Sequence, residues 1–158
     1  MRYWLMKSEP DVYGIDDLAA QPDQTDHWDG VRNYQARNMM RDEMKKGDKV
    51  FFYHSNCKEP GIVGIAEVAR EGYPDFTAWD PESKYHDPKS TPDNPRWYMV
   101  DLRFKRKLKR PITLREMKNH PELADMPLLR KGNRLSVMPV SKAEWDFILQ
   151  LEKQPPQA

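Results

Sequence analysis

The stretch KVFFYHSNCKEPGIVGIAEVA, residues 49–69, decides the fold. Its first six residues form a nearly continuous apolar run, which is typical of a central strand. The turn residues Glu59-Pro60-Gly61 follow, and Ile62 to Ala69 then distributes its side chains over two faces, as a second strand does. The sequence therefore predicts two adjacent strands joined by a turn.

Further strands and helices are expected on both sides of this pair. Apolar patterns typical of strands occupy residues 2–6, 97–108 and 135–140. Helices are expected at residues 15–20 and 35–46, the second stopping at Gly47, and behind the capping residues Thr113 and Ser141. About five or six strands in mixed order with small helices predict an α+β fold, a curved mixed sheet or small barrel with flanking helices.

Length and composition indicate one compact domain. The 158 residues suffice for a single hydrophobic core, which we expect to span residues 1–152 and to leave a frayed tail at 153–158. The single cysteine, Cys57, excludes an internal disulfide framework. A charged segment near the start and the lack of a long apolar run predict neither a signal peptide nor a membrane span. We therefore expect a soluble cytoplasmic protein. The sequence does not indicate its oligomeric state.

Overall charge does not identify a partner. The chain has 26 Lys and Arg against 25 Asp and Glu, a net charge of +1, so its bulk electrostatics do not indicate a nucleic-acid binder. Residues 102–110 are strongly basic, and with Arg130, Lys131 and Arg134 they are a candidate phosphate-facing strip. A solvated edge strand protected by Lys and Arg explains the same pattern equally well.

A second informative stretch is WDGVRNYQAR, residues 28–37. It places an indole, a phenol, an amide and two guanidinium groups on a glycine-containing turn and the helix that follows. Residues 51–56 and 76–80 carry similar groups, the latter in a long loop from Glu71 to Pro95. Such side chains stack on a flat ring and bind its polar edge, so the sequence predicts a pocket for a nucleobase.

Five ordered blocks of the chain resemble EVE domain proteins. The blocks are WLMKSEP (4–10), WDGVRNYQAR (28–37), FYHSN (52–56), PGIVG (60–64) and RLSV (134–137). The resemblance covers roughly Met1 to Leu151 and implies a PUA-like fold with a strongly bent sheet. It also implies kinship with YTH domains, which hold a methylated adenine in an aromatic cage, and with a thymocyte nuclear protein group linked to modified cytosines in DNA. Met138 departs from the family pattern, where Gln is frequent.

The resemblance, together with these aromatic and polar side chains, predicts a binding module that uses no cofactor. Its expected partner is DNA or RNA that carries a modified base, above all a modified cytosine. Trp28 is the first choice for a ring wall, because the resemblance to YTH domains places a cage tryptophan here. Trp79 and Tyr85 are candidates for the opposite wall or lid. The other candidates are Ser8, Asn33, Tyr34 and Ser55 for base contacts, and Lys7, Arg32 and Arg37 for phosphate or edge contacts.

Several of these residues have a purely structural alternative. Trp4, Trp97 and Trp145 lie in periodic apolar segments, which favours the core. Asn33 can cap the following helix, and His54 and Ser55 can satisfy backbone groups at a strand end. Asp29 and Glu9 are candidate ion-pair partners of Arg32 and Lys7.

Two other classes of function stay open. An enzyme of base processing or RNA modification would need a catalytic group, but the neighbours His54, Ser55 and Cys57 point to alternating faces of a strand. The loop acids Asp80, Glu82 and Asp87 with His86 lack the spacing of an ordered metal site, so no catalytic or metal residue is predicted. A protein-interaction adaptor would not gather Trp28, Asn33 and Tyr85 around one cavity.

Overall fold

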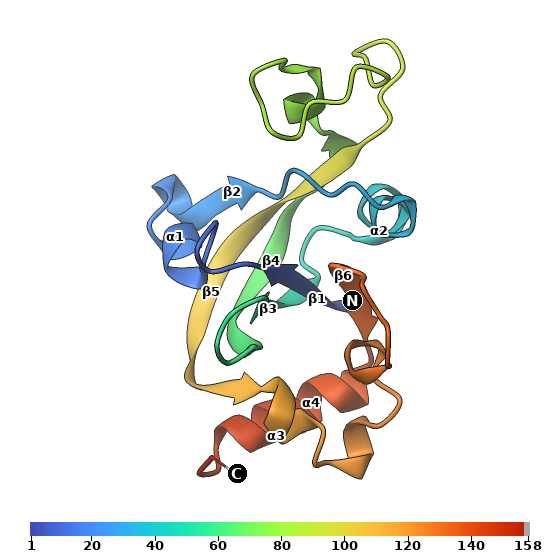
Figure 1. Ribbon diagram of the computed structural model, residues 1–158. Coiled ribbons are helices and arrows are strands. Elements are labelled where there is room, and N and C mark those ends of the chain that lie inside the picture. The colour runs from blue at the N-terminus through green and yellow to red at the C-terminus, as the bar shows by residue number, and fades with distance from the viewer. Residues whose placement is uncertain (157–158) are drawn as a thin grey trace.

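The computed structural model describes residues 1–156 and contains one curved mixed sheet (Figure 1). Its six strands have the order β2-β5-β4-β3-β1-β6, and only the pair β1 and β3 is parallel. The register between the long strands β4 and β5 shifts at several points, which bends the sheet strongly without closing it into a barrel. This confirms the predicted fold class. The strands are β1 (Tyr3–Ser8), β2 (Thr25–His27), β3 (Lys49–His54), β4 (Gly61–Pro74), β5 (Tyr98–Thr113) and β6 (Val137–Val140).

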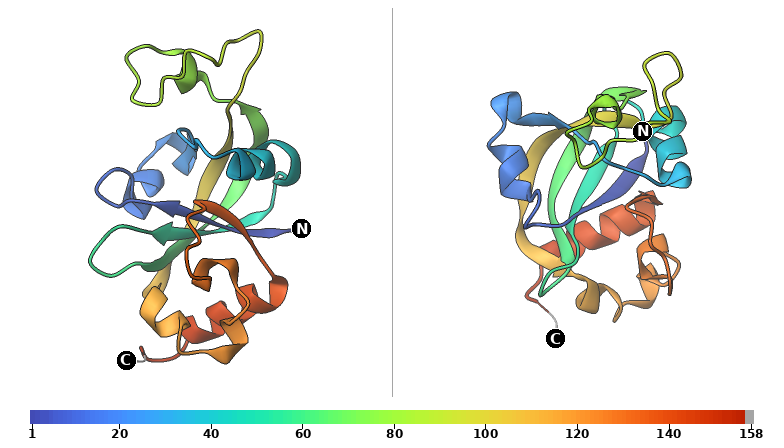
Figure 2. Two further views of the ribbon diagram at one scale, coloured as in Figure 1. Left: turned by 45° about the vertical axis from the view of Figure 1, so that its right-hand side comes forward. Right: turned by 45° about the horizontal axis from the view of Figure 1, so that its top comes forward.

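Short helices flank the sheet, and the loop between β4 and β5 projects beyond it at the end opposite α3 and α4 (Figure 2). The α-helices are α1 (Ile15–Ala19), α2 (Tyr34–Asn38), α3 (Leu114–Met117) and α4 (Lys142–Glu152). Short turns of other helix types are η1 (Pro22–Gln24), η2 (Met39–Glu43), η3 (Phe76–Trp79), η4 (Pro121–Leu123) and η5 (Pro127–Leu129). No helix within residues 1–156 is long and apolar enough to cross a membrane.

The central strands are buried on both faces, which explains the continuous apolar run that predicted β3. Phe52 packs into a core with Trp28 and the methionines behind α2, whereas the adjacent Phe51 packs into a second core on the opposite face. In that second core, the Phe51 ring stacks on Trp145 of α4 with 3.8 Å between ring centroids. The sheet therefore separates two cores, and the ends of β1 and β3 emerge between the flanking elements.

The predicted helix at residues 35–46 differs from the observed one. Helix α2 begins at Tyr34 behind the cap Asn33, and it continues as the π-helical turn η2 because the Met44 N–H donates to the Met39 carbonyl at 2.9 Å. The helix ends at Glu43, and Gly47 then turns the chain with a φ of +93°. The wider turn lets Met39, Met40 and Met44 all enter the first core.

Strand boundaries also differ from the prediction, most of all at β4 and β5. Strand β4 extends to Pro74, which shortens the predicted loop, and β5 extends to Thr113. Strand β2 was not predicted because Thr25-Asp26-His27 has no apolar pattern, and it forms by pairing with the edge of β5. Beyond α4, the carbonyl of Gln154 accepts from Arg110 Nε at 2.8 Å, and the last two residues of the predicted tail, 157–158, lie outside the described residues.

A buried carboxylate fixes the start of the sheet. Asp48 is 3% exposed and accepts from the Trp4 indole at 3.0 Å and from the backbone N–H groups of Arg2 and Lys45 at 3.1 and 3.0 Å. We expect Asp48→Ala to lower the free energy of unfolding by about 3 kcal/mol, because it leaves three donors without an acceptor. Urea denaturation measures this change.

The matched control is Asp42→Ala, which removes an exposed carboxylate that, among residues 1–156, forms an ion pair only with the adjacent Arg41. The control is expected to unfold at the same urea concentration as the wild-type protein. A wild-type urea midpoint for Asp48→Ala would contradict the structural role given to Asp48.

Candidate nucleic-acid interface

A cavity of about 650 Å³ opens where the end of β1, the turn after β2 and the projecting loop meet. Its size lies within the range of small-molecule sites and accommodates a nucleobase. Strand ends supply one part of the wall and loops the rest. The lining residues are Lys7, Ser8, Glu9, Val12, Tyr13, Asp26, His27, Trp28, Asp29, Gly30, Val31, Arg32, Ser55, Lys84, Tyr85, Arg134 and Ser136.

Trp28 forms a rigid wall of this cavity. Its indole is 9% exposed and packs edge-to-face on Phe52 and Tyr13, with ring centroids 5.4 and 6.4 Å away. Its backbone N–H donates to the Val100 carbonyl at 2.8 Å, which continues the pairing of β2 with β5. The core thus fixes the orientation of the indole, and the remaining surface of Trp28 faces the cavity.

Tyr85 reaches the same cavity from the projecting loop. Its ring packs directly on the turn at Gly30, where a Cβ would lie 2.5 Å from the Tyr85 Cζ atom. Gly30 also has a φ of +80°, so both the backbone conformation and the ring contact require glycine there. Trp28 and Tyr85 therefore both line the cavity next to one glycine turn.

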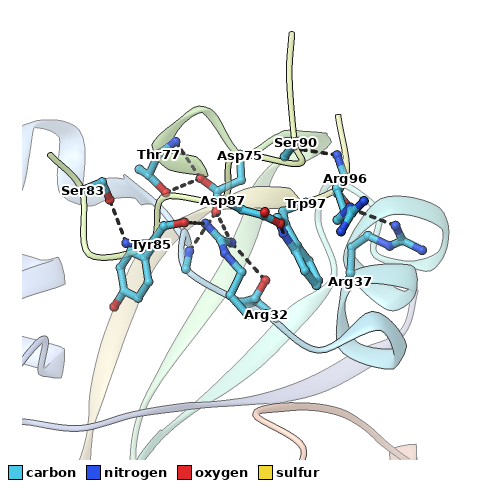
Figure 3. A network of polar contacts seen from close by, with 12 residues as sticks. Arg32, Arg37, Asp75, Thr77, Ser83, Tyr85, Asp87, Ser90, Arg96 and Trp97 are labelled. Atoms are coloured by element: carbon cyan, nitrogen blue, oxygen red, sulfur yellow. Dashed lines mark hydrogen bonds and ion pairs between the residues drawn. The ribbon is translucent and has the colours of Figure 1, made fainter. Parts of the chain in front are cut away.

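Asp75 ties this turn to the loop (Figure 3). Its buried carboxylate accepts from the Gly30 N–H at 2.8 Å, from Arg32 Nη1 at 3.0 Å, and from the N–H and hydroxyl of Thr77 at 2.9 and 2.5 Å. Arg32 Nη2 in turn donates to the Tyr85 carbonyl at 2.6 Å. The guanidinium group lies between the rings of Tyr85 and Trp97, 5.6 and 5.4 Å from their centroids.

The environment of Asp75 favours its charged form. Burial alone raises the pKa of this carboxyl, but the hydrogen bonds from Thr77, Gly30 and Arg32 outweigh burial, so the pKa lies below its ordinary value of 3.8. Because the pKa is lowered in the folded state, the stabilisation is present above pH 3.8 and is lost as the pH falls through the lower folded value. At neutral pH the ion pair with Arg32 is intact.

The structure brings six of the ten predicted site residues to the cavity: Lys7, Ser8, Trp28, Arg32, Ser55 and Tyr85. The other four lie elsewhere. Asn33 Oδ1 accepts from the Ala36 N–H at 3.0 Å as a helix cap, and Tyr34 stacks on Trp97 at 4.8 Å. Arg37 donates to the Arg96 carbonyl at 2.9 Å, and Trp79 lies in η3. Asn33 thus caps α2. Tyr34 and Arg37 connect α2 to residues 96–97 at the end of the projecting loop, outside the cavity.

The structure also decides between roles that the sequence left open. Arg32 pairs with Asp75 instead of Asp29, and Glu9 accepts from Asn56 at 3.2 Å. Trp4 and Trp145 are core residues, whereas Trp97 is buried under the loop and donates to Asp87 at 2.7 Å. Met138 is fully buried in the second core, so the departure from the family pattern does not reach the cavity.

The basic strip at residues 102–110 is largely neutralised. Arg106 and Arg110 form bidentate pairs with Glu152 and Glu116, and the hydrogen bonds measure 2.6 to 2.9 Å. Lys105 and Lys107 pair with Glu67 and Asp16 at 3.5 and 3.0 Å. This pattern favours the protected-strand interpretation over a phosphate-facing strip.

Apart from Arg32, which pairs with Asp75, the cations at the cavity are different. Lys7, Lys84 and Arg134 line it, and none of them forms an ion pair within residues 1–156. Burial lowers the pKa of Lys7, whose ammonium group lies 5.9 Å from the Tyr53 ring centroid. Lys84 was not predicted as a site residue, because a lysine in a loop belongs to no periodic pattern that would reveal it.

The residues that suggested catalysis have structural partners. The Cys57 thiol lies 3.8 Å from the His54 carbonyl, and the His54 ring accepts from the Ile15 N–H at 3.1 Å. Burial lowers the pKa of His54, which fits a neutral acceptor. Within the described part of the chain, no group of three His, Cys, Asp or Glu side chains is arranged to hold a metal ion.

Comparison with known proteins gives a consistent result. The family model for the EVE domain matches residues 2–151. Thymocyte nuclear protein 1 of Danio rerio is 50% identical over 170 residues, which cover 97% of this chain and 73% of the relative.

Solved structures agree over nearly the full length. The crystal structure of human THYN1 protein in complex with 5-methylcytosine-containing DNA is 47% identical, with a TM-score of 0.93, and covers 99% of this chain and 100% of that one. A Pseudomonas putida protein of known structure is 51% identical, with a TM-score of 0.91, and covers 95% of this chain and 99% of that one.

The role of Asp75 can be tested on the loop itself. We expect Asp75→Asn to release the projecting loop, because it breaks a partly buried ion pair whose carboxylate is fully buried, and breaking a fully buried pair costs about 3–5 kcal/mol as an upper limit. Hydrogen exchange measured by mass spectrometry should show faster exchange in residues 76–97 and unchanged protection in β3 and β4.

The control Asp93→Asn alters an exposed carboxylate in the same loop and should exchange like the wild-type protein. If Asp75→Asn left the exchange of residues 76–97 unchanged, the loop would be held by other contacts.

Proposed function

Because this chain belongs to the EVE domain family, we propose that it is a DNA-binding module that holds 5-methylcytosine in the cavity between Trp28 and Tyr85. The observation that carries the proposal is the likeness to human THYN1 protein, whose structure contains 5-methylcytosine in DNA. The cavity described above supplies the site. The sequence also predicts a module that binds a modified base, above all a modified cytosine, and this agrees with the proposal.

The cavity offers what an extruded base requires. A base inside a duplex must leave the stack, and the indole of Trp28 and the phenol of Tyr85 provide aromatic surfaces to replace its neighbours. Stacking on aromatic side chains contributes about 1–3 kcal/mol per base. Burial of the 5-methyl group adds about 0.8 kcal/mol, which corresponds to roughly a fourfold preference over cytosine.

The three cavity cations that form no ion pair among residues 1–156 divide between contacts to the base and contacts to the nucleic-acid backbone. Lys84 and Arg134 are exposed at the cavity and suit phosphate contacts, whereas Lys7 is half-buried and suits the edge of the base. The paired side chains of β5 leave little free positive charge on that strand. The electrostatic part of binding is therefore expected to be local to the cavity.

Other sequence predictions are less well supported. Trp28 and Tyr85 share a cavity, which disfavours an adaptor without a base pocket, although Asn33 lies outside it. The contacts of Cys57 and His54 give no support to an enzyme. Binding to RNA stays a prediction. The cytoplasmic location also stays a prediction, and the vertebrate relatives, called thymocyte nuclear protein 1, do not support it.

The proposal predicts a preference for the methylated base that depends on both walls. Wild-type protein should bind a DNA duplex with one 5-methylcytosine about four times more tightly than its unmethylated twin. Tyr85→Ala should abolish most of this preference, because it removes one wall without opening the core. Fluorescence anisotropy on matched DNA and RNA duplexes measures it, and Trp28→Ala provides a second variant.

The matched control is Phe147→Ala, which truncates a half-buried aromatic residue of α4 on the far side of the sheet. It should keep the preference. Equal binding of methylated and unmethylated duplexes by the wild-type protein would refute the proposed function.

The division of cations makes a separate prediction about salt. The double variant Lys84→Ala with Arg134→Ala should reduce the slope of log affinity against log salt concentration by about 2, because two phosphate contacts are lost. The pair Lys105→Ala with Lys107→Ala should leave the slope unchanged. If the Lys105 and Lys107 variant reduced the slope and the Lys84 and Arg134 variant did not, the phosphate contacts would lie on β5.

A further inference from the structure

A binder of 5-methylcytosine in DNA must reject thymine. Thymine carries the same methyl group on C5, so a slot for the methyl group cannot separate the two bases. They differ at position 4, where cytosine has an amino donor and thymine has an oxygen acceptor. Rejection of thymine therefore requires an acceptor in the cavity at the position that the amino group occupies.

The cavity contains three carboxylates, and two of them have other partners. Asp26 accepts from the Tyr13 hydroxyl at 2.7 Å and from the His27 N–H at 2.8 Å. Glu9 is exposed and accepts from Asn56. The carboxylate of Asp29 is half-buried, and among residues 1–156 it accepts only from its own backbone N–H. Asp29 thus has acceptor capacity to offer a ligand.

The position of Asp29 is fixed from both sides. The N–H of the preceding Trp28 is bound by Val100, and the N–H of the following Gly30 is bound by Asp75. The backbone that carries the Asp29 side chain is therefore anchored at the lining of the cavity.

The surroundings of Asp29 disfavour its charged form. Burial raises the pKa of this carboxyl, the nearby Asp75 and Asp26 raise it further, and His27 partly offsets them. A half-buried carboxylate whose single donor is its own backbone N–H keeps free acceptor positions away from bulk water, which is unfavourable for the folded protein, and a base amino group would supply a further donor.

We propose that Asp29 is the specificity-determining residue of the cavity, accepting a hydrogen bond from the 4-amino group of 5-methylcytosine and repelling the 4-oxygen of thymine. This inference rests on the proposed function. A carboxylate is a suitable acceptor for the cytosine amino group, and a matched contact of this kind discriminates about 5- to 150-fold against the wrong base. Lys7, the half-buried cation of the same cavity, can serve the acceptor atoms on the rest of the edge.

The test uses three DNA duplexes that differ only in the base opposite one guanine: cytosine, 5-methylcytosine or thymine. Thymine pairs poorly with guanine and leaves the stack more easily, so any rejection of thymine must come from the cavity. Wild-type protein should bind 5-methylcytosine at least about fivefold more tightly than thymine. Asp29→Asn should bring the two within about twofold, largely by binding thymine better, because the amide can donate to the 4-oxygen.

Asp29→Ala is the second variant, and it should also lose the rejection of thymine because the repelling charge is gone. Asp125→Asn, an exposed carboxylate between η4 and η5, controls for the change in net charge and should behave like the wild-type protein. Thermal unfolding supplies an independent readout, since Asp29→Asn should melt no lower than the wild-type protein.

The outcomes separate the role of Asp29 from the proposed function. Retained rejection of thymine by both Asp29 variants, with 5-methylcytosine still preferred over cytosine, would overturn the role of Asp29 and leave the proposed function standing. A wild-type protein that does not prefer 5-methylcytosine over cytosine would overturn the proposed function and this inference together.

Discussion

The ion pair between the buried Asp75 and the partly exposed Arg32 is the interaction on which the candidate site depends. It joins two segments that are 43 residues apart in sequence, the glycine turn after β2 and the loop that projects from the sheet. Through Arg32 it also fixes the Tyr85 backbone. Without this link the cavity would keep its wall at Trp28 and lose the opposite wall, because Tyr85 belongs to a loop outside both cores.

The sheet supplies the other half of the geometry. Since β1 and β3 run parallel and are buried on both faces, their carboxyl ends emerge together and place Lys7, Ser8 and Ser55 at one edge of the cavity. The same two-sided burial holds Trp28 against Phe52. A rigid sheet with one tethered loop thus combines a wall that belongs to the core with a wall that a surface loop supplies, as is common in binding sites.

Local sequence signals predicted much of this structure. The apolar run of β3 has the bounds that were expected, and Thr113 and Ser141 cap helices as expected. Long-range contacts could not be predicted in this way. Asp75 carries no local sign of its partner Arg32, and Tyr34 was expected at the base but stacks on Trp97, since a single sequence does not show which loop covers an exposed aromatic residue.

A crystal structure of this protein with a DNA duplex that contains one 5-methylcytosine would test the proposed base pocket at the level of atoms. We expect the methylated base to have left the duplex and to lie between Trp28 and Tyr85, with its amino group on the Asp29 carboxylate. A base that stays stacked in the duplex, or that binds on the surface formed by Tyr34 and Trp97, would show that the cavity is not the base-binding site.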